Sequence, residues 1–135
     1  MDTGLIKLKK MIADRPSSAT LPRKSQVLNI LQHKSVYVPW GIYVDTIGNT
    51  NNLLLIENKV LVQLIQKNNE LEIHICCKMR DRANLKNTLL NYLNWFASYN
   101  WSAIYTTAPD DRKALKRMLI NLGFIQQNER WVYGF

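Results

Sequence analysis

A change of hydrophobic period near residue 80 constrains the fold of this chain more than any other feature. From Glu70 to Cys77 apolar and polar residues largely alternate, as in a β-strand with one buried face. From Asn84 to Ser98 the apolar residues recur every three or four positions, which predicts an amphipathic helix. Trp101–Thr106 is again rich in strand-forming residues. A strand, a crossover helix and a second strand together predict a parallel, right-handed strand pair.

The chain ahead of this point predicts antiparallel strands. Leu53–Ile56 and Val60–Ile65 flank the polar Glu57–Lys59, which indicates a hairpin, and Gln66–Asn69 forms the next turn. Sequential strands joined by tight turns are antiparallel. Further strand formers lie at Val36–Val38 and Ile42–Val44, on either side of Pro39-Trp40-Gly41.

The first 35 residues allow two interpretations. Leu5, Ile6, Leu8 and Ile12 form a helical stripe, whereas Leu5–Lys9 also fits a short strand, and the period leaves both open. Ser25 is placed to cap a second helix. The residues that this second helix would bury are Val27, Leu28, Ile30 and Leu31.

A helix and a hairpin are predicted to close the domain. Thr107 is placed to cap the helix, Pro109 suits its first turn, and the acidic Asp110-Asp111 complements its dipole. Gly123 occupies the position of a left-handed C-cap. The buried stripe is Leu115, Met118, Leu119 and Leu122, and the hairpin pairs Phe124–Ile125 with Trp131–Tyr133.

The whole chain is expected to form one domain over residues 1–135. Its fold class is α/β, with a mixed, mostly antiparallel, twisted sheet of about six to seven strands and flanking helices. Apolar residues make up 47% of the sequence and aromatic residues 10%, which excludes a disordered chain. The longest apolar runs are too short to cross a bilayer, and Met1–Gly4 does not begin a signal peptide. We therefore expect a soluble intracellular protein without a membrane partner.

The sequence offers too few ligands for a metal site. Cys76 and Cys77 are adjacent, so a disulfide between them would be strained. The other soft ligands are His33 and His74. We expect buried, reduced thiols and no metal.

The formal net charge of +8 suits an anionic partner. Nucleic acid, a phosphorylated cofactor and an acidic protein surface are the candidates, and solubility alone is the competing explanation. One basic helix surface, made of Arg112, Lys113, Lys116 and Arg117, could contact nucleic-acid phosphate.

From Glu70 onwards the order of elements resembles that of the GNAT superfamily, the acetyl-CoA-dependent N-acetyltransferases. Glu70–Cys77 matches its fourth strand, Lys78–Leu85 its cofactor loop and Lys86–Ser98 the following helix. Trp101–Thr106 matches the fifth strand, and Asp110–Leu122 matches the next helix, ending in the Leu-Gly-Phe common in the family. The resemblance implies a GNAT-like fold and acetyl-CoA as the cofactor.

The family's cofactor loop usually reads Arg/Gln-x-x-Gly-x-Gly/Ala, and its glycines let backbone N–H groups approach the pyrophosphate. Placing Arg80 first puts Ala83 and Leu85 at the two glycine positions, and Asp81 adds a negative charge. By resemblance, the residues that would hold the CoA pyrophosphate are Lys78, Arg80, Arg82, Ala83, Asn84 and Leu85. The competing interpretation of this loop is a solvated basic turn.

The resemblance also locates the catalytic groups. Many members carry a Tyr in the helix before Leu-Gly-Phe as the general acid, and here that position is Leu119, with Tyr105 a distant substitute. Glu72 and His74 share one face of the fourth strand, where members often keep a catalytic carboxylate, so they are the candidate general bases. The competing interpretation is an exposed polar strand face.

Two functions follow from this resemblance. The altered loop and Leu119 favour a GNAT-fold protein with an eroded acetyl-CoA loop, acting as a non-catalytic binding or assembly module. Small basic GNAT-like proteins of this kind resemble those of bacteriophages, some associated with the virion or its head, which implies the host cytoplasm or the virion as the location. The alternative is an active acetyl-CoA-dependent N-acyltransferase that acts on a primary amine, with Glu72 or His74 drawing off the proton.

Overall fold

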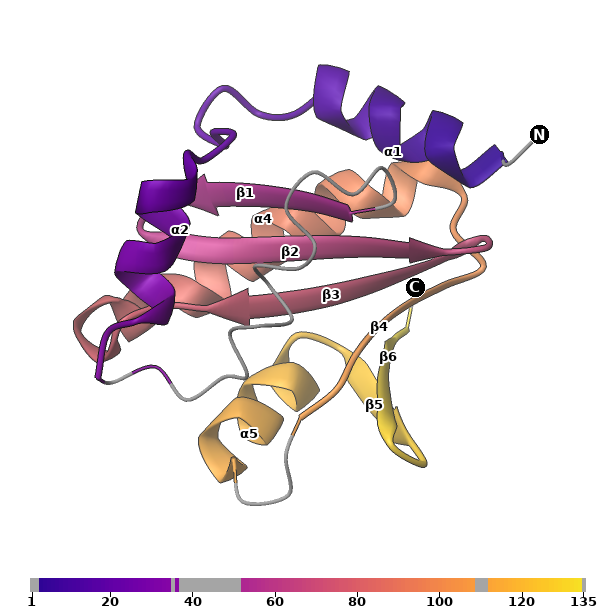
Figure 1. Cartoon of the computed structure of the whole chain (residues 1–135). Coiled ribbons are helices and arrows are strands. Elements are labelled where there is room, and N and C mark those ends of the chain that lie inside the picture. The colour runs from indigo at the N-terminus through magenta and orange to yellow at the C-terminus, as the bar shows by residue number, and fades with distance from the viewer. Residues whose placement is uncertain (1–2, 35, 37–51, 109–111, 135) are drawn as a thin grey trace.

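In the computed structural model, one six-stranded sheet organises the chain; the structure describes residues 3–34, 36, 52–108 and 112–134 (Figure 1). The spatial order of the strands is β1-β2-β3-β4-β6-β5. The strands are β1 (Asn52–Glu57), β2 (Val60–Lys67), β3 (Glu70–Cys76), β4 (Ala103–Thr106), β5 (Phe124–Gln127) and β6 (Arg130–Tyr133). Every neighbouring pair is antiparallel except β3 and β4, which are parallel. The predicted mixed, mostly antiparallel α/β sheet is confirmed.

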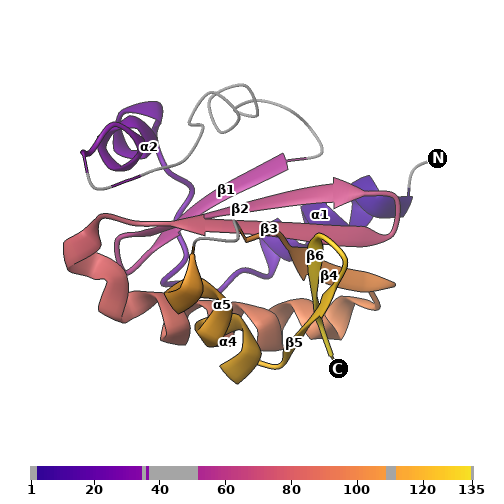
Figure 2. The ribbon, with the colours of Figure 1, turned by 90° about the horizontal axis from the view of Figure 1, so that it is seen from below.

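Helices cover both faces of the sheet. The helices are α1 (Thr3–Ala13), α2 (Lys24–Leu31), α4 (Leu85–Phe96) and α5 (Lys113–Asn121), with short 3-10 helices η1 (Met79–Asn84) and η2 (Ala97–Tyr99) at the two ends of α4. Figure 2 shows α2 on one side of the sheet and α4 and α5 on the other. No helix within the described ranges is long and apolar enough to cross a membrane.

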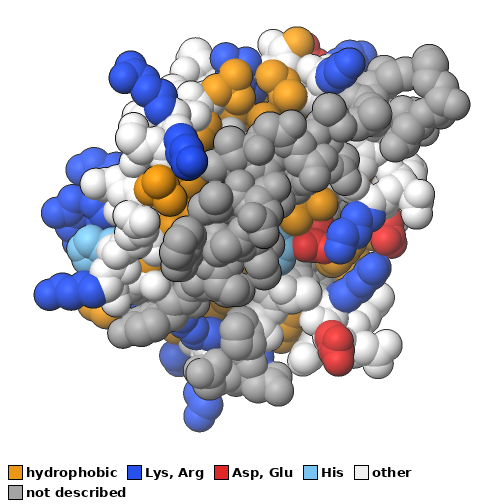
Figure 3. All heavy atoms as spheres, viewed as in Figure 1, with side chains coloured by type: hydrophobic (Ala, Val, Ile, Leu, Met, Phe, Trp, Pro, Cys, Tyr) orange, Lys and Arg blue, Asp and Glu red, His pale blue; other side chains and the backbone are white. Residues whose placement is uncertain are grey.

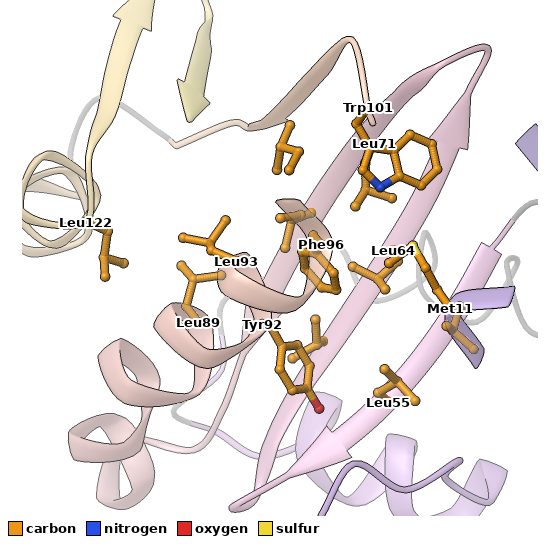
Figure 4. Close-up of a cluster of buried hydrophobic side chains, with 14 of the residues drawn as sticks. Met11, Leu55, Leu64, Leu71, Leu89, Tyr92, Leu93, Phe96, Trp101 and Leu122 are labelled. Atoms are coloured by element: carbon orange, nitrogen blue, oxygen red, sulfur yellow. The ribbon is translucent and has the colours of Figure 1, made fainter. Parts of the chain in front are cut away.

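The main core lies between the sheet and the helices α1, α4 and α5. Leu89, Tyr92, Leu93 and Phe96 form one face of α4, because they recur every three or four residues, and they point at the strands (Figure 4). Each such side chain contributes about 1.5 to 3 kcal/mol when it is fully buried. Other members of this core are Leu8, Met11, Leu55, Leu64, Leu71, Trp101, Leu119 and Leu122.

A smaller core lies on the opposite face, under α2. It contains Val27, Ile30 and Leu31 from α2, and Leu61 and Cys76 from the sheet. Both thiols are buried as expected, and burial, together with the charge of Asp81, raises the pKa of Cys77. Adjacent strand residues point to opposite faces, so Cys77 belongs to the main core instead.

The turns follow the predicted chemistry. Asn58 and Lys59 between β1 and β2 both have positive φ, which a two-residue hairpin turn of type I′ requires. Gly123 has φ +100°, and its N–H donates to Ile120 O at 3.1 Å, in agreement with the predicted left-handed C-cap after α5.

The N-terminal segment and α5 refine the sequence predictions. The open choice for Leu5–Lys9 is resolved as helix. The cap of α2 is Arg23 and not Ser25, since the Arg23 N–H donates to Gln26 Oε1 at 2.8 Å. The last helix begins at Lys113, because Arg112 has non-helical φ −92° and ψ 67°, so Thr107 is not its cap. The predicted strands at Tyr37–Val38 and Ile42–Val44, and the acidic first turn at 110–111, lie outside the described residues.

Candidate functional site

The parallel strands β3 and β4 separate partway along their length. They pair only at Glu70–Ala103, Leu71–Ile104 and Glu72–Tyr105, whereas β3 continues to Cys76. Beyond this point β4 pairs with β6 on its other side. The carboxyl ends of two parallel strands therefore diverge, and such a point is where open α/β sheets bind ligands.

The two predicted base residues lie next to each other at this divergence. His74 Nε2 and Glu72 Oε2 form a short hydrogen-bonded pair. The Glu72 carboxylate also accepts hydrogen bonds from Lys67 Nζ and from the Tyr105 hydroxyl, both at 3.0 Å on Oε1. Only 12% of the Glu72 side chain and 24% of the His74 side chain are exposed. The prediction that these two residues share one strand face is confirmed, but their face is partly covered and not simply exposed.

This arrangement gives the residues different protonation states. The hydrogen bond from His74 is the main reason why the pKa of Glu72 falls to about 2, against the opposing effect of burial. Burial, followed by the hydrogen bond to Glu72, raises the pKa of Tyr105 to about 12. At neutral pH Glu72 is thus an anion and Tyr105 is a phenol.

The contact with Glu72 fixes the orientation of the His74 ring. Because ionised Glu72 can only accept, the ring nitrogen facing it, Nε2, must carry hydrogen. The lone pair of the neutral ring then lies on Nδ1. Glu72 orients this histidine, as the carboxylate orients the histidine in other acid–base sites.

Tyr105 and Arg130 belong to the same cluster, although Tyr105 was predicted only as a distant substitute for the general acid. The Arg130 guanidinium lies 4.0 Å from the centre of the Tyr105 ring, and Arg130 Nη1 is 3.3 Å from Glu70 Oε2. The register of β3, β4 and β6, which no local sequence pattern encodes, brings them together by putting Glu72, Tyr105 and Val132 in one row.

The predicted cofactor loop is helical. It forms η1, in which the Asp81 N–H donates to Lys78 O at 2.9 Å and the Leu85 N–H donates to Arg82 O. The i to i+3 hydrogen-bond pattern of a 3-10 helix runs between them. The amides of Asp81 and Leu85 are therefore already bonded to the loop's own carbonyl groups.

The side chains of the loop differ in their contacts and in their exposure. Lys78 Nζ donates to Asn29 Oδ1 at 2.7 Å, and Asn84 Nδ2 donates to Asn58 O at 2.9 Å. Leu85 packs against the main core. Arg80, Arg82 and Ala83 are exposed, whereas Asp81 is buried. The structure thus brings Lys78 and Arg80 together with Asp81, and it directs Asn84 and Leu85 elsewhere.

A hollow of about 470 Å³ opens on the α2 side of the sheet. Its lining comes from α2, the end of β1, the β1–β2 turn and the start of η1. The lining residues are Ser25, Gln26, Asn29, Ile30, Ile56, Lys59, Lys78, Arg80 and Asp81. Sequence reasoning missed this site, because its residues come from three separate parts of the chain.

Two further predictions concern catalysis. Leu119, at the position of the family's general acid, is 1% exposed and belongs to the main core. Among the described residues, no group of three or more His, Cys, Asp or Glu side chains could hold a metal ion.

Comparison with solved structures identifies the fold. A chimera of spermidine N-acetyltransferase SpeG from Vibrio cholerae and hSSAT matches with a TM-score of 0.67 and 13% identity, over 85% of this chain and 94% of that chain. A domain from Methanocaldococcus jannaschii gives 0.58 and 13%, over 85% and 94% of the two chains. The ribosomal-protein-S5-alanine acetyltransferase from Vibrio fischeri gives 0.57 and 10%, over 84% and 88%.

The chain therefore has the fold of the GNAT acetyltransferases, as its order of elements predicted. Comparison of the sequence itself with protein-family models and with curated proteins found no match. At 10% to 13% identity the structural likeness defines the fold, and the reaction has to be argued from the site.

Proposed function

We propose that this protein is a non-catalytic GNAT-fold module that binds a negatively charged partner within a larger assembly. The observation that carries this proposal is the helical loop η1, because the amides of Asp81 and Leu85 already have carbonyl partners. A CoA pyrophosphate at this loop would lose the backbone donors on which the family relies. Leu119 in the core supports the proposal, since it supplies no acid.

The positive net charge of the chain supports the proposal that its partner is negatively charged. The net charge of +8 favours association with nucleic acid or with an acidic protein surface. Figure 3 shows Lys and Arg side chains along the α2 edge and at other places around this face, and fewer acidic side chains, mainly on the side away from α2. A place in a bacteriophage virion or head is the assembly that we propose on the likeness in fold and size.

Calorimetry with acetyl-CoA and with CoA tests the loss of cofactor binding. We expect no heat of binding from the wild-type protein at ligand concentrations near 1 mM, well above the usual KM range. The variant Arg82→Glu is the control, because its exposed side chain lies on the loop. Micromolar binding that Arg82→Glu abolishes would contradict the proposal.

Purification from the native source tests the assembly role. We expect the protein to sediment with a particle or with a stable partner, and moderate salt should release it if the contact is mainly electrostatic. A strictly monomeric protein at every salt concentration would count against this role.

One observation favours a second function, an N-acyltransferase. The Glu72–His74 pair and Tyr105 stand where β3 and β4 diverge, and His74 Nδ1 is suited to accept the proton of an amine. Spermidine and ribosomal protein S5 are acceptors suggested by the structural neighbours. Turnover of acetyl-CoA with either acceptor that His74→Gln reduces by about a hundredfold or more would support this function. Absence of acetyl-CoA binding would exclude it.

A further inference from the structure

We propose that the hollow between α2, the β1–β2 turn and η1 binds a small phosphate monoester. The site goes beyond the assembly role proposed above and does not depend on it. Its cations Lys78 and Arg80 follow the carboxyl end of β3, whereas α2, the end of β1 and the β1–β2 turn supply most of the remaining lining. Strand β2 separates β1 from β3, and the β1–β2 turn that supplies Lys59 is on the side of β3 opposite to β4.

Hydrogen bonds between the walls hold the hollow in shape. Lys78 at the start of η1 is bonded to Asn29 of α2 at 2.7 Å, and Asn84 of η1 is bonded to the carbonyl of Asn58 in the turn at 2.9 Å. On the far side, the backbone of Thr20 pairs with Ile56 of β1 through bonds of 2.9 and 3.0 Å. These hydrogen bonds connect elements that are distant in sequence. The walls of the hollow are therefore already ordered, and a bound ligand would pay only a small entropy cost for fixing them.

The lining of the hollow is rich in hydrogen-bond donors. The side-chain oxygen of Asn29 accepts from Lys78, and that of Gln26 accepts from the backbone of Arg23. Each amide therefore keeps its NH₂ group as a donor. Lys59 and Arg80 add charged donors, and Ser25 adds a hydroxyl. A ligand for this site has to be an acceptor with several oxygen atoms.

The charge of the lining matches a dianion. Three cations, Lys59, Lys78 and Arg80, face one carboxylate, Asp81, which leaves two positive charges. Arg80 is only loosely held by Asp81, with 3.9 Å between Nε and Oδ2, and 70% of its side chain is exposed. A phosphate monoester carries about two negative charges at neutral pH, whereas a carboxylate carries one.

Lys59 occupies a position where a lysine is unfavourable for the backbone. Its φ of 64° lies in the left-handed region, and the second residue of a type I′ turn is usually glycine. A non-glycine residue there costs about 1 kcal/mol. A contribution of the Lys59 side chain to ligand binding would compensate for this backbone cost.

The size and the apolar floor define the rest of the ligand. The volume of about 470 Å³ is that of a small-molecule site. Ile30 and Ile56 supply an apolar surface beside the charged rim. We therefore expect a monoester with a compact apolar or aromatic body, for which phenyl phosphate is a suitable probe.

An NMR titration of the ¹⁵N-labelled protein tests the site. Phenyl phosphate should shift the amide signals of Lys59 and Lys78, and benzoate, with the same ring and a single charge, should bind about tenfold more weakly or worse. Lys59→Glu should weaken phenyl phosphate binding by about tenfold or more, and Arg80→Glu serves as a second variant. Arg82→Glu is the matched control, because Arg82 is exposed on the same loop but does not line the hollow.

The outcomes separate this site from the assembly role. No shift with phenyl phosphate at about 10 mM, equal affinity for benzoate, or unchanged affinity in both Lys59→Glu and Arg80→Glu would each overturn the site. A parallel titration with CoA gives the second readout. CoA binding that is lost in Arg82→Glu and kept in Lys59→Glu would overturn the non-catalytic module and leave the phosphate site standing.

Discussion

At the scale of single residues, Glu72 controls the chemistry of the cluster at the strand divergence. Its carboxylate accepts hydrogen bonds from His74, Lys67 and Tyr105, so it stays ionised where an ordinary glutamate would titrate. The same contacts keep the Tyr105 phenol protonated.

The depressed pKa of Glu72 predicts a pH dependence of stability. Its folded pKa of about 2 lies below the usual 4.5, so its stabilising effect is complete above pH 4.5 and is lost as the pH falls toward 2. We expect the wild type to lose about 2 kcal/mol more unfolding free energy between pH 6 and pH 3 than Glu72→Gln does. Urea unfolding at the two pH values measures the difference, and equal losses would contradict the assignment.

Gly123 provides a second residue-scale prediction. An added Cβ would meet only the Tyr133 ring at 3.6 Å, an ordinary contact, so the cost comes from φ +100°. Gly123→Ala should lower the unfolding free energy by about 1 to 2 kcal/mol. Gly134→Ala is the control, since its added Cβ also meets only ordinary contacts and its φ lies outside the left-handed region. Similar losses in the two variants would argue against backbone strain at Gly123.

At the scale of elements, the sequence predicted strands and helices well where the hydrophobic period was long. β3, α4 and β4 follow the change of period at residue 80, and the hairpin β1–β2 follows its turn residues. It was less successful at the helix caps, since Arg23 and not Ser25 caps α2, and Thr107 does not cap α5, which begins at Lys113.

The cluster and the hollow were harder to predict for a physical reason. Tyr105 meets Glu72 through the register of two parallel strands, and no local pattern encodes that register. The hollow depends on α2, a turn and η1 meeting in space. The absence of glycine from the loop is visible in the sequence, but its helical conformation required the structure.

The buried face of α4 should contribute more to the free energy of unfolding than its exposed face does. Phe96 is fully buried between the helix and the sheet, so Phe96→Ala should cost about 3 to 5 kcal/mol through lost burial and a cavity. Leu90→Ala on the same helix, at 39% exposure, should cost less than about 1 kcal/mol. Thermal and urea unfolding of both variants check the contrast, which would disappear if α4 packed only loosely.

At the scale of the whole molecule, the overall fold matches the GNAT acetyltransferases, whereas the loop after β3 has to be described from this chain alone. The GNAT acetyltransferase fold brings two parallel strands apart and places a loop and a helix at their ends. In this chain the loop is helical, and its Lys78 and Arg80 line a hollow together with residues of α2 and the β1–β2 turn. The scaffold is thus kept, while the amides of Asp81 and Leu85 are bonded to carbonyl groups of the loop itself.

The backbone amides of Asp81 and Leu85 test this central claim most directly. Hydrogen exchange followed by NMR, with and without about 1 mM acetyl-CoA, reports whether the two N–H groups are free for a ligand. We predict that both are protected in the free protein and that acetyl-CoA changes neither their exchange nor their chemical shifts. Fast exchange in the free protein, followed by protection and large shifts on addition of acetyl-CoA, would contradict the account.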